Sequence, residues 1–222
     1  MKDARRLPRL PREATADRAP ERGARVLPFP DTLPDDTALL RMLVEGDARA
    51  PRAVWQRFFS LVHRLLQRAF GPDHDVDDLV QEVFLVLFRR ASTIREAKAL
   101  PAYVLSITAH TIRREIRRKR ALSWLQLAPA AIARAKDADL DAREAVKRLY
   151  RMLDRLGANE RTAFVLRFVE GLPVDELARA LDVSPATAKR RASRAWNRVV
   201  VWSERDAALV EYLAALPAEG AP

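Results

Sequence analysis

Hydrophobic residues recur along this chain at intervals of three and four positions, with polar residues between them. That spacing places apolar side chains on one face of a helix, whereas the alternation typical of a half-buried strand is not sustained. Proline and glycine fall between the periodic segments and mark their ends. Up to residue 122 the pattern predicts four helices, at Asp35–Glu45, about Pro51–Ala69, about Val76–Arg90 and about Leu100–Leu122.

A second helical segment follows a stretch of weaker pattern. It predicts helices at Arg143–Leu156, Asn159–Val169, Pro173–Ala180 and Ser184–Trp202, with a short amphipathic helix over Arg205–Leu216. The expected fold class is therefore all-α, with two small helical domains joined by a linker and a helix-turn-helix in the C-terminal one. The expected parts are a disordered basic tail (1–34), a first helical domain (35–122), the linker (123–142), the helix-turn-helix domain (143–202) and a C-terminal extension (203–222).

The pattern of a helix-turn-helix covers residues 173–198. Its first helix carries the small Ala178 on the apolar face, which lets a second helix cross closely. Asp182 stands at the turn, where glycine is usual, and aspartate also tolerates a left-handed backbone. Ser184 is a good N-cap and Pro185 a good first-turn residue, so the second helix is predicted to begin there.

This second helix has the charge expected of a helix that enters the major groove of DNA. Five basic residues and no acidic one lie between Ser184 and Arg198. Arginine suits bidentate contact with guanine, and flanking cations suit phosphates. A solvated basic helix in an ordinary helical hairpin is the alternative. The predicted DNA contacts are Ser184, Thr187, Lys189, Arg190, Arg191 and Arg194.

A second basic cluster lies at the end of the predicted helix Leu100–Leu122. Six basic residues lie between Arg113 and Arg120, with Glu115 as the one acidic residue among them. This density fits a track along a nucleic-acid backbone, and equally a solvated face or cations at the negative end of a helix. The candidate contacts are Tyr103, which also fits a core position, and His110, Arg113, Arg114, Arg117 and Arg118.

The predicted helix Val76–Arg90 begins acidic and continues into an apolar run. Aspartates between Asp73 and Asp78 suit the positive N-terminus of a helix. From Val83 to Phe88 no residue is polar. Because a unit this small cannot easily bury every side of a helix, part of that surface is expected to meet a partner. Full burial within the fold is the alternative.

Composition narrows the classes of function. The net charge of +10, from 40 basic and 30 acidic residues, favours an anionic partner, either nucleic acid or an acidic membrane face. The absence of cysteine excludes a disulfide framework and suits a reducing cytoplasm, which is the expected location. No apolar stretch approaches the roughly 20 residues that span a bilayer, so no membrane span is expected.

No motif typical of an enzyme stands out in the sequence. A phosphate-cradling glycine loop, a metal-binding histidine pair and a nucleophile motif are all missing. His74 among aspartates raises the question of a metal site, but consecutive aspartates at a helix start point in diverging directions. The expectation is therefore no enzymatic activity, no catalytic residue, no metal and no cofactor.

Together these segments resemble bacterial RNA polymerase sigma factors of the extracytoplasmic-function (ECF) type, across about Leu39 to Val200. Two stretches carry the resemblance, DLVQEVF at 78–84 and ERTAFVLRFVEGLPVDELARALDVSPATAKRR at 160–191, and they are specific in combination. The resemblance implies a two-domain helical factor for transcription initiation, with no cofactor and no catalytic residue of its own.

The resemblance also implies partners and roles. The polymerase-docking helix, which binds the β′ clamp coiled coil of core RNA polymerase, is matched by Asp78, Leu79, Gln81, Glu82 and Phe84. The reader and opener of the −10 element of promoter DNA is matched by Ala91–Ala99 and Tyr103–Arg118, and the −35 reader by the helix from Ser184. An anti-sigma factor becomes a candidate partner, although no residue identifies one.

Two departures from the family pattern affect DNA recognition. Thr108-Ala109-His110 stands where the family often has Ala-Arg-Asn, and the recognition helix is rich in alanine where bulkier residues are common. Its basic residues must therefore carry much of the contact. The alternative function is a stand-alone helix-turn-helix regulator that binds an operator without docking on polymerase. Such a regulator does not need the helix at Asp77–Phe84.

Overall fold

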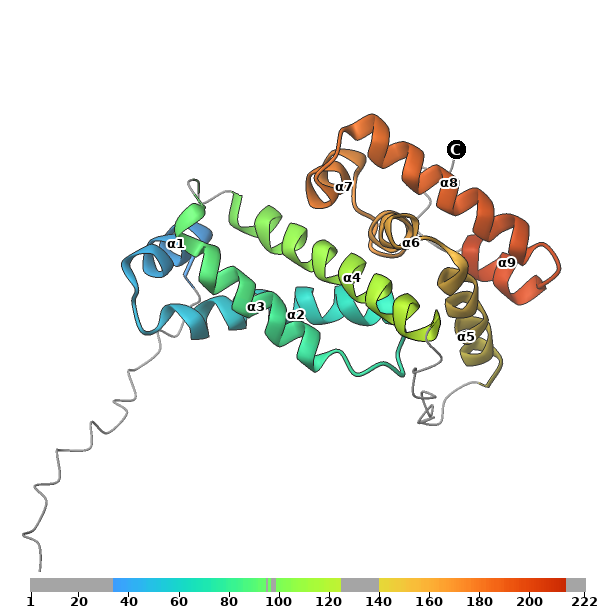
Figure 1. Cartoon of the computed structure of the whole chain (residues 1–222), viewed down its shortest axis with the longest axis horizontal. Helices are drawn as coiled ribbons and strands as arrows, with labels where there is room; N and C mark the ends of the chain where they lie inside the picture. The colour runs from blue at the N-terminus through green and yellow to red at the C-terminus, as the bar shows by residue number, and fades with distance from the viewer. Residues whose placement is uncertain (1–33, 95, 97–98, 125–139, 215–222) are drawn as a thin grey trace, which may run out of the picture. The chain divides into compact units, whose positions relative to one another are not determined.

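The computed structural model describes residues 34–94, 96, 99–124 and 140–214 (Figure 1). The secondary structure of these residues consists of helices without a strand, which confirms the all-α fold class. The predicted tail and most of the predicted linker lie outside the described residues. The elements are α1 (Asp36–Glu45), α2 (Ala50–Phe70), α3 (Asp77–Arg90), η1 (Ala91–Thr93), α4 (Leu100–Trp124), α5 (Leu140–Arg155), α6 (Ala158–Phe164), η3 (Val165–Val169), α7 (Val174–Leu181), α8 (Pro185–Ser203) and α9 (Ala207–Ala214).

Local capping explains where these helices begin and end. The Asp35 carboxylate accepts a hydrogen bond of 2.7 Å from the amide of Ala38 at the start of α1. Gly46 ends that helix in the left-handed conformation, with φ of 70°. Gly71 ends α2 with φ of 101° and ψ of 163°, a conformation almost restricted to glycine. Most predicted boundaries therefore agree with the structure to within a few residues.

The predicted helix Asn159–Val169 is the main departure. It divides into α6 and the π-helical turn η3, in which the amide of Glu170 bonds the carbonyl of Val165 at 2.9 Å, five residues back. In addition, α4 extends to Trp124 and α5 begins at Leu140, so the connection between them is shorter than the predicted linker. The predicted C-terminal helix appears as the shorter α9.

Each half of the described chain has its own apolar core. In the N-terminal half (α1–α4), α2, α3 and α4 pack together around fully buried residues that include Leu65, Leu87 and Ile112. In the C-terminal half (α5–α9), the ring of Phe168 lies 4.6 Å from that of Trp196, which joins η3 to α8. Each core is large enough to fix the direction in which its surface side chains point.

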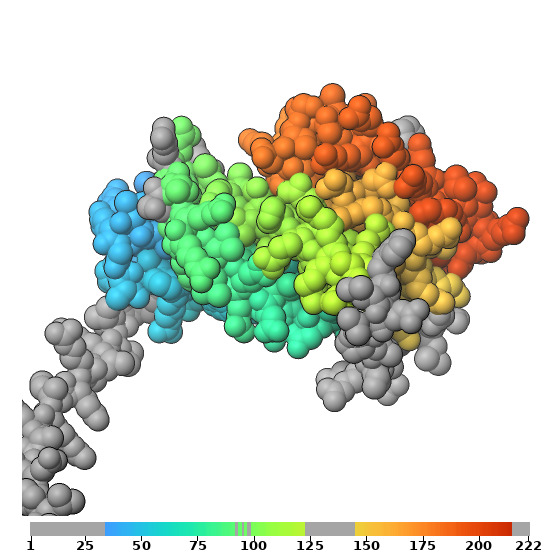
Figure 2. All heavy atoms as spheres, in the orientation of Figure 1, coloured from blue at the N-terminus to red at the C-terminus, as the bar shows by residue number. Residues whose placement is uncertain are grey.

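The two halves also pack against each other. Helix α4 contacts α6 and α7, and α2 contacts η3; the atoms of α4 meet those of the C-terminal half along one border in Figure 2. At the end of α2, the Tyr150 hydroxyl donates to the carbonyl of Arg68 at 2.9 Å. Arg161, only 5% exposed, donates twice to the carbonyl of Ala69, at 3.0 and 2.8 Å. The described helices therefore form one unit.

Candidate nucleic-acid interface

The helix-turn-helix is formed by α7 and α8, and its turn follows the sequence prediction. Asp182 adopts φ of 53° and ψ of 57°, the left-handed conformation that glycine usually supplies at this point. The Ser184 hydroxyl accepts from the amide of Thr187 at 3.3 Å, and Pro185 occupies the first turn. Buried Ala188, Ala192 and further small residues let α8 lie close to α6 and α7. This packing fixes the outward face of α8.

That outward face carries cations without protein partners. Lys189, Arg190 and Arg194 are exposed, and within the described part of the chain no ion pair or hydrogen bond engages their side chains. Arg191 and Thr187 are half-buried beside them. Ser184 serves the helix itself, because its hydroxyl bonds both the amide and the hydroxyl of Thr187. Unpaired cations on a rigid helix suit direct contact with phosphates and guanine edges.

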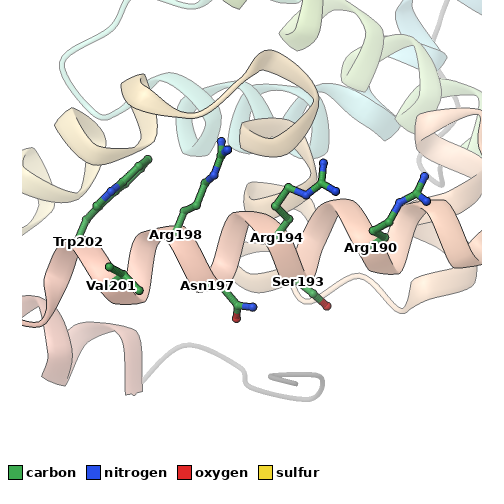
Figure 3. Close-up of a pocket in the computed structure, with 7 residues that line it drawn as sticks. All are labelled: Arg190, Ser193, Arg194, Asn197, Arg198, Val201 and Trp202. Carbon is green, nitrogen blue, oxygen red and sulfur yellow. The ribbon is translucent and has the colours of Figure 1, made fainter.

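A groove of about 520 Å³ continues this face toward the end of α8. Figure 3 shows the side chains that line it. Arg190, Arg194 and Arg198 extend along one side of the helix, and Asn197 lies on the adjoining side. Arg198 differs from the other two arginines, since its guanidinium pairs with Glu160 at 2.8 Å. Sequence reasoning missed Asn197; its helical spacing from Arg190 and Arg194 could have signalled it.

The basic cluster on α4 is arranged differently, because protein atoms engage each of its arginines. Arg118 makes two hydrogen bonds to Glu115, at 2.6 and 2.7 Å, and Arg114 pairs with Glu82. Arg113 donates to the carbonyl of Leu181 at 3.1 Å, and Arg117 donates to the carbonyl of Arg113 at 3.2 Å. The sequence shows how dense the positive charge on α4 is, but not that protein atoms already bond these arginines.

Burial and neighbouring charges affect the titration of this cluster. Burial, together with the charges of Arg113 and Arg117, lowers the pKa of His110 below its ordinary value of 6.5, so the ring is mainly neutral at pH 7. Burial alone would raise the pKa of Glu115, but the hydrogen bonds and charge of Arg118 lower it overall. Tyr103 is half-buried at the start of α4. A neutral His110 can both donate and accept a hydrogen bond to a base.

The acidic-apolar helix α3 divides the predicted docking residues into two groups. Asp78 and Gln81 are exposed and Glu82 is half-buried, whereas Leu79 (9% exposed) and Phe84 (2%) lie in the core. The ring of Trp55 covers Phe84 at 4.5 Å between centroids. Leu79 and Phe84 therefore support the outer face of α3 and do not form it.

The apolar run Val83–Phe88 is neither wholly exposed nor wholly buried. Val83 and Leu87 are fully buried, but Leu85 is 52% exposed. Leu85 follows Asp78 and Gln81 at spacings of seven and four residues, so the three share one face of α3. Full burial of the run is thus wrong at Leu85, which sequence reasoning did not single out.

At His74, which the sequence raised as a candidate metal ligand, a lysine side chain lies against the ring. The Lys119 ammonium lies 3.0 Å from Nε2 and 3.3 Å from Nδ1 of the ring. Burial, followed by the charge of Lys119, lowers the pKa of His74. In the described residues no group of three acidic or histidine side chains could hold a metal ion.

None of the described helices is both long and apolar enough for a membrane span.

Comparison with known proteins identifies both halves. Residues 54–122 match the family described as Sigma-70 region 2, and residues 147–198 match Sigma-70, region 4. The chain is 31% identical over 139 residues to the ferric citrate uptake sigma factor FecI of Escherichia coli (strain K12). That alignment covers 61% of this chain and 78% of FecI. It is 28% identical over 164 residues to the ECF RNA polymerase sigma factor SigM of Mycobacterium tuberculosis (strain ATCC 25618 / H37Rv), covering 74% of this chain and 82% of SigM.

A solved structure has a similar fold. It is described as CnrH in complex with the cytosolic domain of CnrY, and it aligns with a TM-score of 0.57 at 21% sequence identity. The alignment covers 78% of this chain and 99% of the other. At this level of identity the likeness supports the fold alone.

Proposed function

Because the chain belongs to the extracytoplasmic-function sigma factors of the sigma-70 type, we propose which of its surfaces meet polymerase and promoter. The chain directs RNA polymerase to promoters, and its partners are core RNA polymerase and promoter DNA. The members of this family are transcription initiation factors, and we infer no enzymatic activity for this chain. Its proposed place of action is the cytoplasm, with the polymerase.

The proposed −35 reader is the outward face of α8. The observation that carries this proposal is the set of exposed cations Lys189, Arg190 and Arg194, which lack protein partners in the described residues. Free guanidinium groups can bond guanine without first breaking a contact to the protein. Arg191 and Thr187 flank them, and Ser184 caps the helix from which they project.

The proposed −10 surface is the basic face of α4, with Tyr103, His110 and four arginines. Here DNA has to compete with protein partners for the guanidinium groups. Unstacking a promoter base costs a few kcal/mol, which a capture pocket near α4 would offset. The neutral His110 ring is suited to a base edge, and exposed Arg117 to a phosphate.

The proposed polymerase-docking surface is the exposed face of α3, formed by Asp78, Gln81, Glu82 and Leu85. An exposed leucine flanked by acidic and amide groups is typical of a contact with an apolar centre and a polar rim. Leu79 and Phe84 hold this face in place from the core. An anti-sigma factor remains a candidate partner by family membership only.

The test is transcription in vitro with core polymerase and a promoter library. We expect promoter-specific transcripts with the wild-type chain, and their absence would refute the assignment of function.

For docking, Gln81→Ala combined with Leu85→Ala should weaken binding to core polymerase about tenfold, since contacts at the centre of an interface dominate affinity. The matched control is Gln56→Ala, an exposed glutamine on α2. Unchanged core affinity in the double variant would show that polymerase docks on another surface of the chain.

A further inference from the structure

The proposed docking helix α3 begins without a strong cap of its own. Val76 stands at its N-cap, and a valine side chain cannot accept a hydrogen bond from the first turn. The preceding residue compensates in part, because the Asp75 carboxylate accepts from the amide of Asp77 at 3.0 Å. The direction in which α3 starts therefore depends on how the loop of residues 72–76 is attached to its surroundings.

His74 attaches this loop at three points. Its amide donates to the carbonyl of Gly71 at 3.3 Å, and its carbonyl accepts from Nε2 of Gln67 at 3.0 Å, so both backbone groups are bonded to the end of α2. Its ring meets α4, because the Lys119 ammonium lies 3.0 Å from Nε2 and 3.3 Å from Nδ1. Of these three contacts, the one with Lys119 joins the loop to α4.

The Lys119 ammonium contacts a second aromatic ring. It lies 4.9 Å from the centre of the Phe70 ring, and the rings of Phe70 and His74 are 5.2 Å apart. Lys119 is half-buried, and burial lowers its pKa although the charge of Glu115 opposes this shift. Attraction between a cation and a ring is stronger where water is partly removed. The contact of Lys119 with the two rings is therefore a built part of the fold.

The contact between Lys119 and His74 requires a neutral imidazole. A neutral ring has one nitrogen that accepts a hydrogen bond, whereas both nitrogens of the protonated ring are donors, and an ammonium has no acceptor. The charged groups that face the ring are Lys119 and Glu115 from α4, Asp75 from the loop and Arg161 from α6. Burial, followed by the charge of Lys119, lowers the pKa of His74 below its ordinary value of 6.5. Acidification therefore adds a positive charge where the fold disfavours one.

We propose that Lys119 is a positioning residue for polymerase binding, which fixes the start of α3 through the ring of His74 and releases it when His74 is protonated. This inference rests on the proposed function of α3 as the docking helix. Lys119 and His74 belong to neither the proposed docking surface nor the proposed DNA surfaces, so they act through the backbone of α3. A docking face held in one direction loses less conformational freedom on binding than one that varies.

The position of α3 can be measured on the full chain without polymerase. Lys119→Met keeps an unbranched apolar side chain against the two rings and removes the ammonium. Hydrogen exchange at the amides of residues 80–82, the first to be bonded within α3, should become about fivefold faster, given what one hydrogen bond contributes. Lys119→Arg retains a cation and its donors, and it should restore the slow exchange. Exchange that stays slow in Lys119→Met would overturn the proposal.

Titration of His74 by NMR provides a second measurement on the same chain. The pKa of His74 should rise toward 6.5 in Lys119→Met, because the charge that helps to lower it is gone. A general loss of packing around α3 would not be reversed by a conservative substitution, whereas Lys119→Arg should return this pKa to the wild-type value. If Lys119→Met leaves the pKa unchanged, the ammonium does not act on the ring and the inference is wrong.

Binding to core polymerase tests the consequence for docking. At about pH 7.5, Lys119→Met should weaken core binding about fivefold and Lys119→Arg should not, since one hydrogen bond contributes a factor of this size. The matched control is Lys147→Met, at a half-buried lysine on α5. Equal affinity of Lys119→Met and this control would refute the role in docking. If the wild type failed to bind core polymerase, the proposed function would be wrong, and hydrogen exchange would still decide whether Lys119 holds α3.

The pH dependence of core binding separates the effect of His74 from other titrating groups. In His74→Gln the amide oxygen accepts from Lys119 at any pH. From about pH 7.5 to about pH 5, the affinity of the wild type should therefore fall about twofold further than that of His74→Gln. The matched control, His63→Gln on α2, replaces a half-buried ring that packs on Phe59 and should keep the wild-type profile. Identical profiles for His74→Gln and the wild type would contradict the release of α3 by acid.

Discussion

The two basic helices, α4 and α8, carry similar charge in the sequence and differ in how the fold uses it. On α8, Lys189, Arg190 and Arg194 extend from a capped helix without a partner in the described residues. On α4, Arg113, Arg114 and the other arginines of the cluster all contact protein atoms. The density of positive charge is therefore a poor guide to its availability. A cation that the fold leaves unpaired can bind DNA without first giving up a contact to the protein.

The largest effect is expected on the free cations of α8. Arg190→Ala combined with Arg194→Ala should weaken binding to a duplex that carries the −35 element about 100-fold, because each contact of arginine with a base contributes about 1–3 kcal/mol. Fluorescence anisotropy at fixed salt concentration measures this. Arg205→Ala, an exposed arginine beyond α8, is the matched control. Equal affinity of the double variant and the control would remove the distinction between the two helices.

Alkaline pH should loosen the contact between α5 and the end of α2, where the Tyr150 hydroxyl donates to the carbonyl of Arg68. Burial raises the pKa of Tyr150 to about 12 from 10.0. Because the folded-state pKa is raised, the stabilisation is complete below pH 10 and is lost as the pH rises to about 12. Over this range unfolding should become easier by up to about 2.5 kcal/mol in the wild type. Urea unfolding of Tyr150→Phe should lack this component, and identical pH profiles would show that Tyr150 is not its source.

The cap of α8 should contribute less to stability. Ser184→Ala removes the acceptor of the Thr187 amide, which should lower the free energy of unfolding by about 1 kcal/mol. Urea unfolding measures the change. Ser60→Ala, at an exposed position inside α2, should leave stability equal or slightly higher, because alanine is the better helix former. If both variants were equally stable, the cap would not be what holds the start of α8.

The smallest effects should separate two arginines on α4. Arg117→Ala should weaken promoter binding a few-fold and reduce the salt dependence by about one phosphate contact. Arg118→Ala should change binding less, because Glu115 already engages its guanidinium. Instead, the pKa of Glu115 should rise once burial is no longer opposed, which NMR titration measures. A larger loss of binding for Arg118→Ala would reverse the assignment on α4.

Local signals in the sequence predicted the helices well. Asp35, Gly46 and Ser184 act through neighbours three or four residues away, so short stretches of sequence contain what decides these helix ends. Asp182 likewise adopts the left-handed turn that its residue type allows. The π-helical turn η3 was missed, because the apolar spacing of Val165–Val169 is compatible with either kind of helix.

The partners of surface side chains could not be predicted in this way. Glu170 is separated from Arg64 by 106 residues, and nothing in the local pattern links them. On α3, Leu85 and Phe84 are neighbours of the same chemical kind, yet one is exposed and the other buried. Which of them faces the core depends on where α2 and Trp55 lie, and this is a property of the assembled fold.

The dipeptide Gly71-Pro72 does more than stop α2. Had the helix continued, the amide of residue 72 would have bonded the carbonyl of Arg68, but proline has no such hydrogen. The next residue would likewise have bonded the carbonyl of Ala69, had Gly71 not turned the backbone away. The break thus leaves the carbonyls of Arg68 and Ala69 without amide donors from their own helix, and Tyr150 and Arg161 donate to them instead. A dipeptide that ends a helix locally therefore also fixes where α5 packs, because Tyr150, some 80 residues later in the chain, bonds an acceptor that the break leaves free.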